Sequence, residues 1–194
     1  MTQFDSHYYK RFYRDPKTRV TDKRAAERLG NFVCSYLGYL ELPIKRVLDL
    51  GCGLGHWQGV VKRHYPRARY QGVEYSSYLC EQYGWQQGSV VDYRSKKSFE
   101  LVICQGVLPY LEKADAKRAI ENLATLCSGA LYLEAVTRDD LDAGVIDTKR
   151  TDGSMQLRPG SFYRRALAPY FTPIGGGVWL SRRASVVFYQ LEKP

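Results

Sequence analysis

Two acidic residues and a run of alternating glycines stand at spacings that could build a ligand site. Glycine occupies every second position of residues 51–55, directly after the apolar run 47–50. It lets the backbone approach a ligand and adopt dihedral angles that other residues rarely take. Asp49 lies inside the apolar run, and Glu74 follows about 20 residues after the glycines. A carboxylate accepts hydrogen bonds from hydroxyl groups, so the pattern could hold a polar ligand against the backbone. The glycines are Gly51, Gly53 and Gly55.

A strand, a turn and a helix are needed to bring these residues together. The apolar run predicts a buried strand, and residues 56–64 predict a helix that Tyr65-Pro66 ends. A second strand is predicted over residues 69–75, with Glu74 near its end. In a βαβ unit the end of the second strand lies beside the first turn. A carboxylate there can accept both ribose hydroxyls of an adenosine; the alternative is that Glu74 is a surface residue at a strand end.

The glycine spacing separates two classes of cofactor that use such a turn. The dinucleotide fingerprint is G-x-G-x-x-G, whereas this chain reads G-x-G-x-G and has His56 where the third glycine would stand. The whole pattern is an acidic residue, one further residue and then G-x-G-x-G. It resembles motif I of the class I S-adenosylmethionine (SAM)-dependent methyltransferases. Glu74 matches that family's motif II. The resemblance implies SAM as the cofactor; a nucleotide site or a loop without a ligand is the alternative.

Two later segments extend the resemblance. Residues 99–104 predict a fourth strand similar to motif IV, and residues 105–111 predict a loop at the carboxyl end of the sheet, where open α/β sheets bind ligands. Residues 88–93 predict a third strand. The family often has Gly-Asp-Ala there, with Asp holding the adenine amino group; here Ser89 takes the Asp position, while the N–H of Val90 could still reach the ring. The resemblance implies that the cofactor-binding residues are Asp49, Gly51, Cys52, Gly53, Gly55, Glu74, Tyr75, Ser89, Val90, Gln105, Gly106 and Tyr110.

The resemblance also implies an α/β fold. We expect three α/β/α layers around a Rossmann-like, seven-stranded, mostly parallel sheet with an antiparallel C-terminal strand, plus an N-terminal helical lid. The length of 194 residues suits a single domain. Within domain 1–194, residues 1–40 form the lid and a helix, and residues 45–192 form the core. Further predicted helices cover residues 22–40, 76–83, 113–126 and 161–170, and further strands cover 129–136, 173–180 and 184–191.

The catalytic residues are harder to predict than the cofactor site. Methyl transfer from a sulfonium is an in-line displacement, so the protein mainly aligns the groups and excludes water. A general base is needed only where the acceptor is protonated and weakly acidic. The N-terminal segment is rich in Tyr and Arg, which is typical both of an active-site lid and of a flap packed on the core. The candidates for catalysis are His7, Tyr9 and Tyr13, with Glu134 and Tyr163 as further candidate bases; the alternative is that no base exists.

Composition and charge limit the partners. The net charge of +9 favours anionic partners by electrostatic steering, so a small-molecule acceptor could be anionic. Nucleic acid is not favoured, because no compact basic stripe with interleaved aromatic residues occurs. An RNA- or protein-directed methyltransferase remains the alternative function, and a non-catalytic SAM-binding protein a further one.

Location and metal content follow from the same composition. No apolar run approaches the ~18 residues of a membrane span, and residues 1–5 carry no apolar signal region. We therefore expect a cytoplasmic protein without a membrane partner. The five cysteines and three histidines have no metal-ligand spacing, so no metal site is expected. The oligomeric state is left open.

Overall fold

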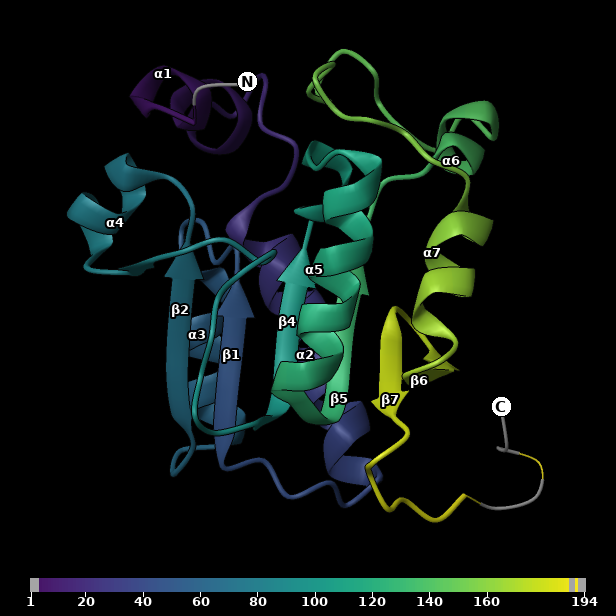
Figure 1. Cartoon of the computed structure of the whole chain (residues 1–194). Helices are drawn as coiled ribbons and strands as arrows, with labels where there is room; N and C mark the ends of the chain where they lie inside the picture. Colours follow the sequence, from purple (N-terminus) through teal and green to yellow (C-terminus); the bar gives the residue numbers. More distant parts are fainter. Residues whose placement is uncertain (1–3, 189–190, 192–194) are drawn as a thin grey trace.

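The centre of the molecule is a mixed β-sheet. A computed structural model describes residues 4–188 and 191 of the 194-residue chain, and in it seven strands pair in the order β3-β2-β1-β4-β5-β7-β6 (Figure 1). Only β7 runs antiparallel to its neighbours, β5 and β6; the other pairs are parallel. This confirms the predicted seven-stranded sheet with an antiparallel C-terminal strand. The strands are β1 (Arg46–Leu50), β2 (Arg69–Glu74), β3 (Gln86–Gln87), β4 (Phe99–Gln105), β5 (Cys127–Glu134), β6 (Phe171–Gly175) and β7 (Val178–Ser181).

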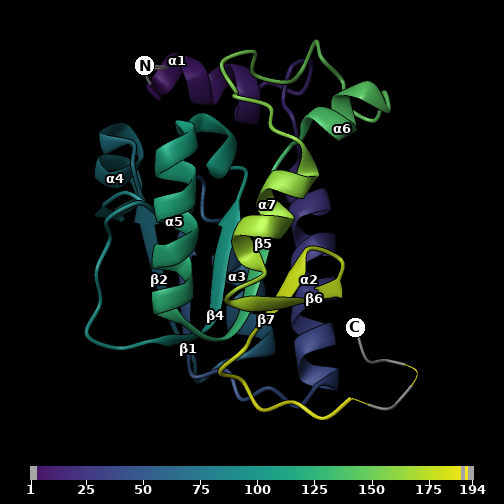
Figure 2. The same ribbon diagram turned by 45° about the vertical axis from the view of Figure 1, so that its right-hand side comes forward.

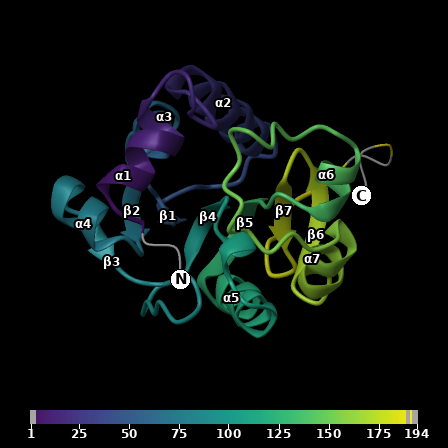
Figure 3. The ribbon, with the colours of Figure 1, turned by 90° about the horizontal axis from the view of Figure 1, so that it is seen from above.

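Helices cover both faces of the sheet and give the predicted three layers (Figures 2 and 3). Helices α2 and α3 lie on one face, and α5 and α7 on the other. None of the helices in the described part of the chain has the length and apolar character of a membrane span. The helical elements are α1 (Ser6–Tyr9), the π-helix η1 (Lys10–Arg14), α2 (Lys23–Tyr39), α3 (His56–His64), α4 (Ser77–Tyr83), the 3-10 helix η2 (Leu108–Tyr110), α5 (Lys113–Leu126), α6 (Arg138–Asp142) and α7 (Gly160–Leu167).

Strand β1 shows how the sequence pattern becomes two apolar layers. Successive side chains of a strand point to opposite faces. Val47 packs into the core beneath α2 and α3, whereas Leu48 and Leu50 pack into the core beneath α5 and α7. Asp49 therefore points to the same face as Val47. A carboxylate inside an apolar layer needs a hydrogen-bond partner, and Tyr70 of β2 supplies one.

The N-terminal segment forms short helices above the carboxyl ends of the strands (Figures 1 and 3). Asp5 caps α1 by accepting a hydrogen bond from the N–H of Tyr8. The helical run ends at Arg14, directly before Asp15-Pro16, where the proline disfavours a helical conformation of the preceding residue. The N-terminal helix of the expected lid is thus present. Asp22 then caps α2 through the N–H of Ala25 at 2.8 Å.

The predicted strand over residues 88–93 is wrong. Residues 88–93 form a turn in which the Ser89 carbonyl accepts the N–H groups of Asp92 and Tyr93. The apolar character of this segment comes from Val90 and Tyr93, which the turn buries in the core, and the paired strand is instead the short β3.

The C-terminal hairpin begins earlier than the sequence suggests. The predicted strand 173–180 is split between β6 and β7, because Gly176 and Gly177 have positive φ angles of 57° and 77° and form the turn. The sequence also predicts a tight turn at residues 181–183 between the two strands, and this segment lies beyond the hairpin. Residues 184–188 form no strand, and residues 189 and 190 of the predicted strand lie outside the described residues.

Candidate cofactor and acceptor site

The glycine turn between β1 and α3 is held tightly against its neighbours. Gly51, Gly53 and Gly55 have φ angles of 79°, 52° and 74°, in the left-handed region that glycine enters without strain. A Cβ atom on Gly55 would lie 2.6 Å from the Trp85 ring, and one on Gly51 would collide with Val107. The sequence pattern therefore reflects real steric limits at this turn.

Glu74 joins the glycine turn to the end of β2. Its Oε2 atom accepts the N–H of Gly53 at 2.9 Å, and its Oε1 atom accepts the N–H groups of Tyr75 and Ser76, also at 2.9 Å. The residue is only 5% exposed. A carboxylate has about four acceptor positions, so three backbone bonds leave room for a ligand hydroxyl. Glu74 and the glycine turn thus lie together, as their spacing predicts.

Asp49 lies beneath the turn and is fully buried. The Tyr70 hydroxyl donates a hydrogen bond of 2.6 Å to its carboxylate. The pKa of Asp49 is raised to about 7, mainly by burial. The bond from Tyr70 lowers it, and the negative charge of Glu74 contributes to raising it. Cys52 is buried beside it, and burial raises the pKa of its thiol, which makes it a poor nucleophile.

A polar network closes the carboxyl ends of β4 and β5. The Gln105 side chain accepts the indole N–H of Trp57 at 2.8 Å and donates to Glu134 at 3.1 Å. The hydroxyl of Tyr132 also donates to Glu134, at 3.0 Å. Gly106 follows with a φ of 68°, and its N–H bonds to the Glu134 carbonyl. Glu134 is itself exposed, so a carboxylate stands at the open edge of the sheet.

Aromatic side chains of the N-terminal helices converge on Tyr110. The hydroxyls of Tyr8 and Tyr110 are 2.9 Å apart, and the Phe4 ring packs edge-on against both rings. Tyr9 and Tyr13 pack against each other with ring centroids 5.5 Å apart. We call these four tyrosines (Tyr8, Tyr9, Tyr13 and Tyr110) the phenol cluster.

Burial is the main cause of the altered acidity in the phenol cluster. It raises the pKa of Tyr13 to about 12 and raises those of Tyr8, Tyr9 and Tyr110 further. These hydroxyls consequently stay protonated at neutral pH. They are suited to donating and accepting hydrogen bonds, and poorly suited to removing protons.

Other predicted site residues do not join this group. His7 is exposed and lines an outer hollow with Lys10, Arg14 and Tyr78. Tyr163 is buried in the core against Arg158.

The residues predicted near the adenine are mostly engaged with the protein itself. The Ser89 hydroxyl accepts the N–H of Val91 at 3.2 Å, and the Val90 side chain lies in the core. The Tyr75 side chain is 55% exposed beside Glu74.

Several residues around the site carry no signal in the sequence. Trp85 donates its indole N–H to the carbonyl of Gly53 at 3.0 Å and thereby supports the glycine turn. Arg158 is buried, and its guanidinium bonds the carbonyls of Leu108 and Leu111 on either side of Tyr110. Both act on the site from distant positions, so neither local spacing nor periodicity could identify them.

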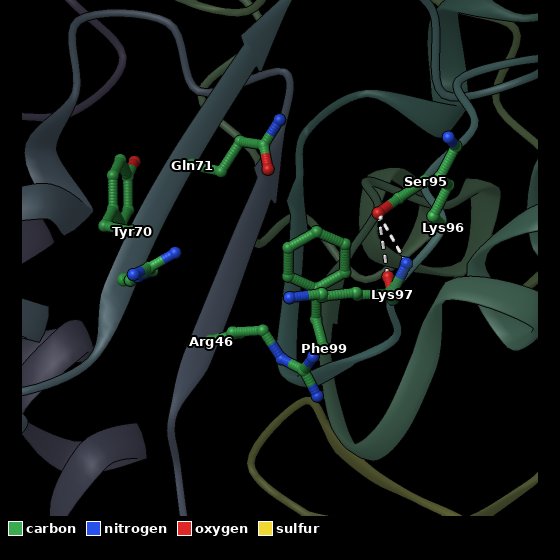
Figure 4. A pocket seen from close by; sticks show the side chains of 8 residues that line it. Arg46, Tyr70, Gln71, Ser95, Lys96, Lys97 and Phe99 are labelled. Carbon is green, nitrogen blue, oxygen red and sulfur yellow. Dashed lines mark hydrogen bonds between the residues drawn. The ribbon is translucent and has the colours of Figure 1, made fainter.

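A separate pocket of about 480 Å³ opens at the amino ends of the strands, opposite the glycine turn (Figure 4). It lies where β1, β2 and β4 begin, and Figure 4 shows Lys97 reaching from the preceding loop past the Phe99 ring. No predicted site residue lines it. Open α/β sheets bind ligands at the carboxyl ends of their strands, so this pocket is not the cofactor site. Its basic residues are Arg46, Arg69, Lys96 and Lys97.

The strand order, the glycine turn and Glu74 together define the fold of a class I SAM-dependent methyltransferase. The family model of the methyltransferase domain matches residues 6–180. The chain therefore belongs to the methyltransferase domain family, whose cofactor is SAM.

Comparison with curated proteins adds one short match. Over 65 residues the chain is 32% identical to a malonyl-[acyl-carrier protein] O-methyltransferase from Legionella pneumophila. The match covers 34% of this chain and 23% of that protein. The chain thus spans about a quarter of the length of the curated relative it matches.

Solved structures show the same fold at low sequence identity. The plantazolicin methyltransferase BpumL, in complex with a plantazolicin analogue and SAH, superimposes with a TM-score of 0.62 at 15% identity, covering 84% of this chain and 72% of that one. The magnesium protoporphyrin IX methyltransferase of Synechocystis, with bound SAH, has a TM-score of 0.61 at 18% identity and covers 94% and 92%. A SAM-dependent methyltransferase from Clostridium acetobutylicum has a TM-score of 0.59 at 12% identity and covers 84% of each chain.

Proposed function

We propose that this protein transfers the methyl group of SAM to an oxygen or nitrogen atom of a small-molecule acceptor. The observation that carries the proposal is the position of Glu74, whose carboxylate is bonded to Gly53 at the carboxyl edge of the sheet. In this proposal the ribose of SAM bonds to Glu74, and the adenine lies near Tyr75, Ser89 and Val90. The remaining cofactor contacts are with the glycine turn, underlain by Asp49 and Cys52, and with Gln105, Gly106 and Tyr110.

The side chains over the site suggest how the protein assists the transfer. Bound SAM supplies an activated methyl group on a cationic sulfur. Tyr8, Tyr9 and Tyr13 lie on the N-terminal helices above the strand ends, where they exclude water and orient the acceptor. Because their hydroxyls stay protonated, they are not the bases of this proposal. Glu134, exposed at the end of β5, is the group that can accept a proton.

The phenol cluster divides the sequence-predicted catalytic residues into two groups. Tyr9 and Tyr13 belong to it, and we retain both as orienting residues of the acceptor. His7 faces the outer hollow beside Lys10, so we give it no part in the transfer.

A small-molecule acceptor is supported by the similar structures. Two of them are named as methyltransferases of plantazolicin and of magnesium protoporphyrin IX. The alternative of an RNA- or protein-directed enzyme is motivated by the net charge of +9. Four of the basic residues, Arg46, Arg69, Lys96 and Lys97, line a pocket at the end of the sheet opposite the glycine turn, so a polyanion bound in that pocket would lie away from the methyl donor.

Location and organisation belong to the same proposal. All five cysteines are free thiols in the structure, which supports a reducing compartment such as the cytoplasm. A single domain, with residues 1–40 as lid and helix and residues 45–192 as core, is consistent with strands that all join one sheet.

Isotope transfer tests the proposal. The protein is incubated with SAM carrying a labelled methyl group and, separately, with the small-molecule, RNA and protein fractions of a cell extract. We expect SAH to form and label to appear in the small-molecule fraction. Label confined to RNA or protein would favour the alternative function. Failure of SAM and SAH to bind at millimolar concentration in calorimetry would refute the proposal outright, and binding without transfer to any fraction would favour the non-catalytic alternative.

A further inference from the structure

The acceptor side of the site is bordered by carboxylates. Asp152 lies on the loop that follows α6, and this loop faces α1 and η1 across the strand ends (Figure 3). Its carboxylate is held by the N–H and hydroxyl of Ser154 at 2.9 and 2.8 Å. Glu134 stands at the end of β5 and Glu74 at the end of β2. Three carboxylates from separate parts of the chain thus surround the phenol cluster.

The charges that act on the phenol cluster agree with this arrangement. Asp152 raises the pKa values of Tyr8, Tyr13 and Tyr110 through its negative charge. Glu74 acts in the same way on Tyr9 and Tyr13, and Glu134 acts on Tyr13. Burial remains the larger cause of each shift, and these three carboxylates all act in the same direction. Carboxylates thus act on the phenol cluster in a chain whose net charge is +9.

Three arginines near the site are directed elsewhere. The guanidinium of Arg14 bonds to Gln82 at 2.7 Å on the outer side of α4. Arg158 is buried, and its donors reach the carbonyls of Leu108 and Leu111. Arg11 lies over the Phe12 ring and is exposed. None of these three side chains compensates the carboxylates that border the phenol cluster.

We propose that the acceptor is an amine, bound as its ammonium form between the phenol cluster and the carboxylates of Asp152 and Glu134. This inference rests on the proposed methyltransferase function and names its substrate class. An ammonium group donates hydrogen bonds to hydroxyl and carboxylate oxygens and is attracted by the faces of Tyr rings. A carboxylate acceptor would meet the negative charges of Asp152 and Glu134 instead. The anionic acceptor suggested by the net charge is accordingly not retained.

The chemistry of this step balances without an additional reactant. The bound ammonium first gives a proton to a carboxylate, for which Glu134 is suited because it opens to solvent. The nitrogen lone pair then forms the N–C bond while the C–S bond of SAM breaks. Its electron pair remains on sulfur as the neutral thioether of SAH. The product is a methylated ammonium ion, and Glu134 passes its proton to water.

Matched acceptor probes test this inference. With the protein saturated by SAH, binding of 2-phenylethylamine, phenylacetate and 2-phenylethanol is measured by NMR titration. SAH formation from SAM is measured with the same three compounds. We expect the amine to bind at least tenfold more tightly than the carboxylate and to be the compound that supports turnover. Preferential binding or methylation of phenylacetate, or no discrimination among the probes while SAH binds, would overturn the inference.

Two variants separate an amine site from a site that serves only the sulfonium of SAM. Asp152→Asn should weaken 2-phenylethylamine binding about tenfold and leave the Kd for SAH within twofold. Asp142→Asn, which removes the same charge from an exposed position of α6, should change neither. Circular dichroism verifies that both variants are folded. If Asp152→Asn weakens SAM relative to SAH and leaves the amine unaffected, the carboxylates serve the donor and the inference is wrong. If the wild-type protein does not bind SAH, the proposed function itself is refuted.

Discussion

The carboxylate of Glu74 offers the sharpest perturbation of the cofactor site. In Glu74→Gln one carboxylate oxygen becomes an NH₂ group. The remaining oxygen can still accept the N–H groups of Tyr75 and Ser76, but the NH₂ group then faces the N–H of Gly53, 2.9 Å from the original oxygen. Two donors confront each other there, and the ribose hydroxyl loses its charged acceptor.

The structure allows the loss to be estimated. A hydrogen bond to a charged group contributes about 1.5–3 kcal/mol, and leaving a buried donor unsatisfied costs about 1–3 kcal/mol. Loss of the bond to the ribose corresponds to a Kd for SAH that is about 10- to 100-fold higher, since about 1.4 kcal/mol changes Kd tenfold. The unsatisfied N–H of Gly53 lowers the stability of the variant instead. Glu74→Asp keeps the charge but shortens the side chain, so its Kd for SAH should lie between those of the wild-type protein and Glu74→Gln.

Isothermal titration calorimetry with SAH measures this effect. Glu81→Gln, on an exposed position of α4, is the matched control and should bind within twofold of wild type. Thermal unfolding without ligand establishes that each variant is folded. A folded Glu74→Gln protein that binds SAH within threefold of wild type would refute the assignment of Glu74 to the ribose.

Three further substitutions test other parts of the site. The pKa of Asp49 is about 7 in the folded protein, whereas that of an unfolded Asp is about 3.9. Between these values the native state binds one more proton than the unfolded state. The contribution of Asp49 therefore lowers the free energy of unfolding as pH rises from about 4 to 7, by at most about 4 kcal/mol. In calorimetric scans between pH 5 and pH 8, the Tm of Asp49→Asn should therefore fall less with rising pH than the Tm of the wild-type protein. An equal fall in both proteins would contradict a raised pKa of Asp49. Gly55→Ala places a methyl group 2.6 Å from the Trp85 ring at a φ of 74° and should weaken SAH binding at least tenfold, whereas Gly84→Ala, at a φ of 71° with open space around it, should only lower Tm by a few degrees. Arg158→Ala frees the carbonyls that flank Tyr110 and should destabilise the fold by about 2–4 kcal/mol in urea unfolding; a change below about 0.5 kcal/mol would show that this buried guanidinium does not hold the loop.

The cofactor half of the site is predictable because it depends on local backbone geometry. The spacing of Gly51, Gly53 and Gly55 and the position of Glu74 follow from one βαβ unit, and the structure brings them together. Strand β4 and helix α5 are also predictable from local sequence, because the strand is an uninterrupted apolar run and the helix has an apolar face. Whether these residues bind SAM as the resemblance implies stays a prediction until a ligand is measured.

The acceptor half could not be predicted, because it is assembled from distant segments. Tyr8 meets Tyr110 across 102 positions of sequence, and Asp152 reaches the same region from a polar loop without periodicity. Pattern reasoning also confused burial with strand formation at Val90 and Tyr93, which pack into the core from a turn. The hairpin was displaced because the glycines at 175–177 were counted as strand rather than as the turn.

A crystal structure of the protein grown with SAH tests the central claim most directly. We predict density for one SAH per chain, with a ribose hydroxyl within hydrogen-bond distance of Glu74 and the sulfur facing the phenol cluster. SAH located instead in the basic pocket at Arg46 and Lys97, or no SAH density from crystals grown at millimolar SAH, would contradict the account.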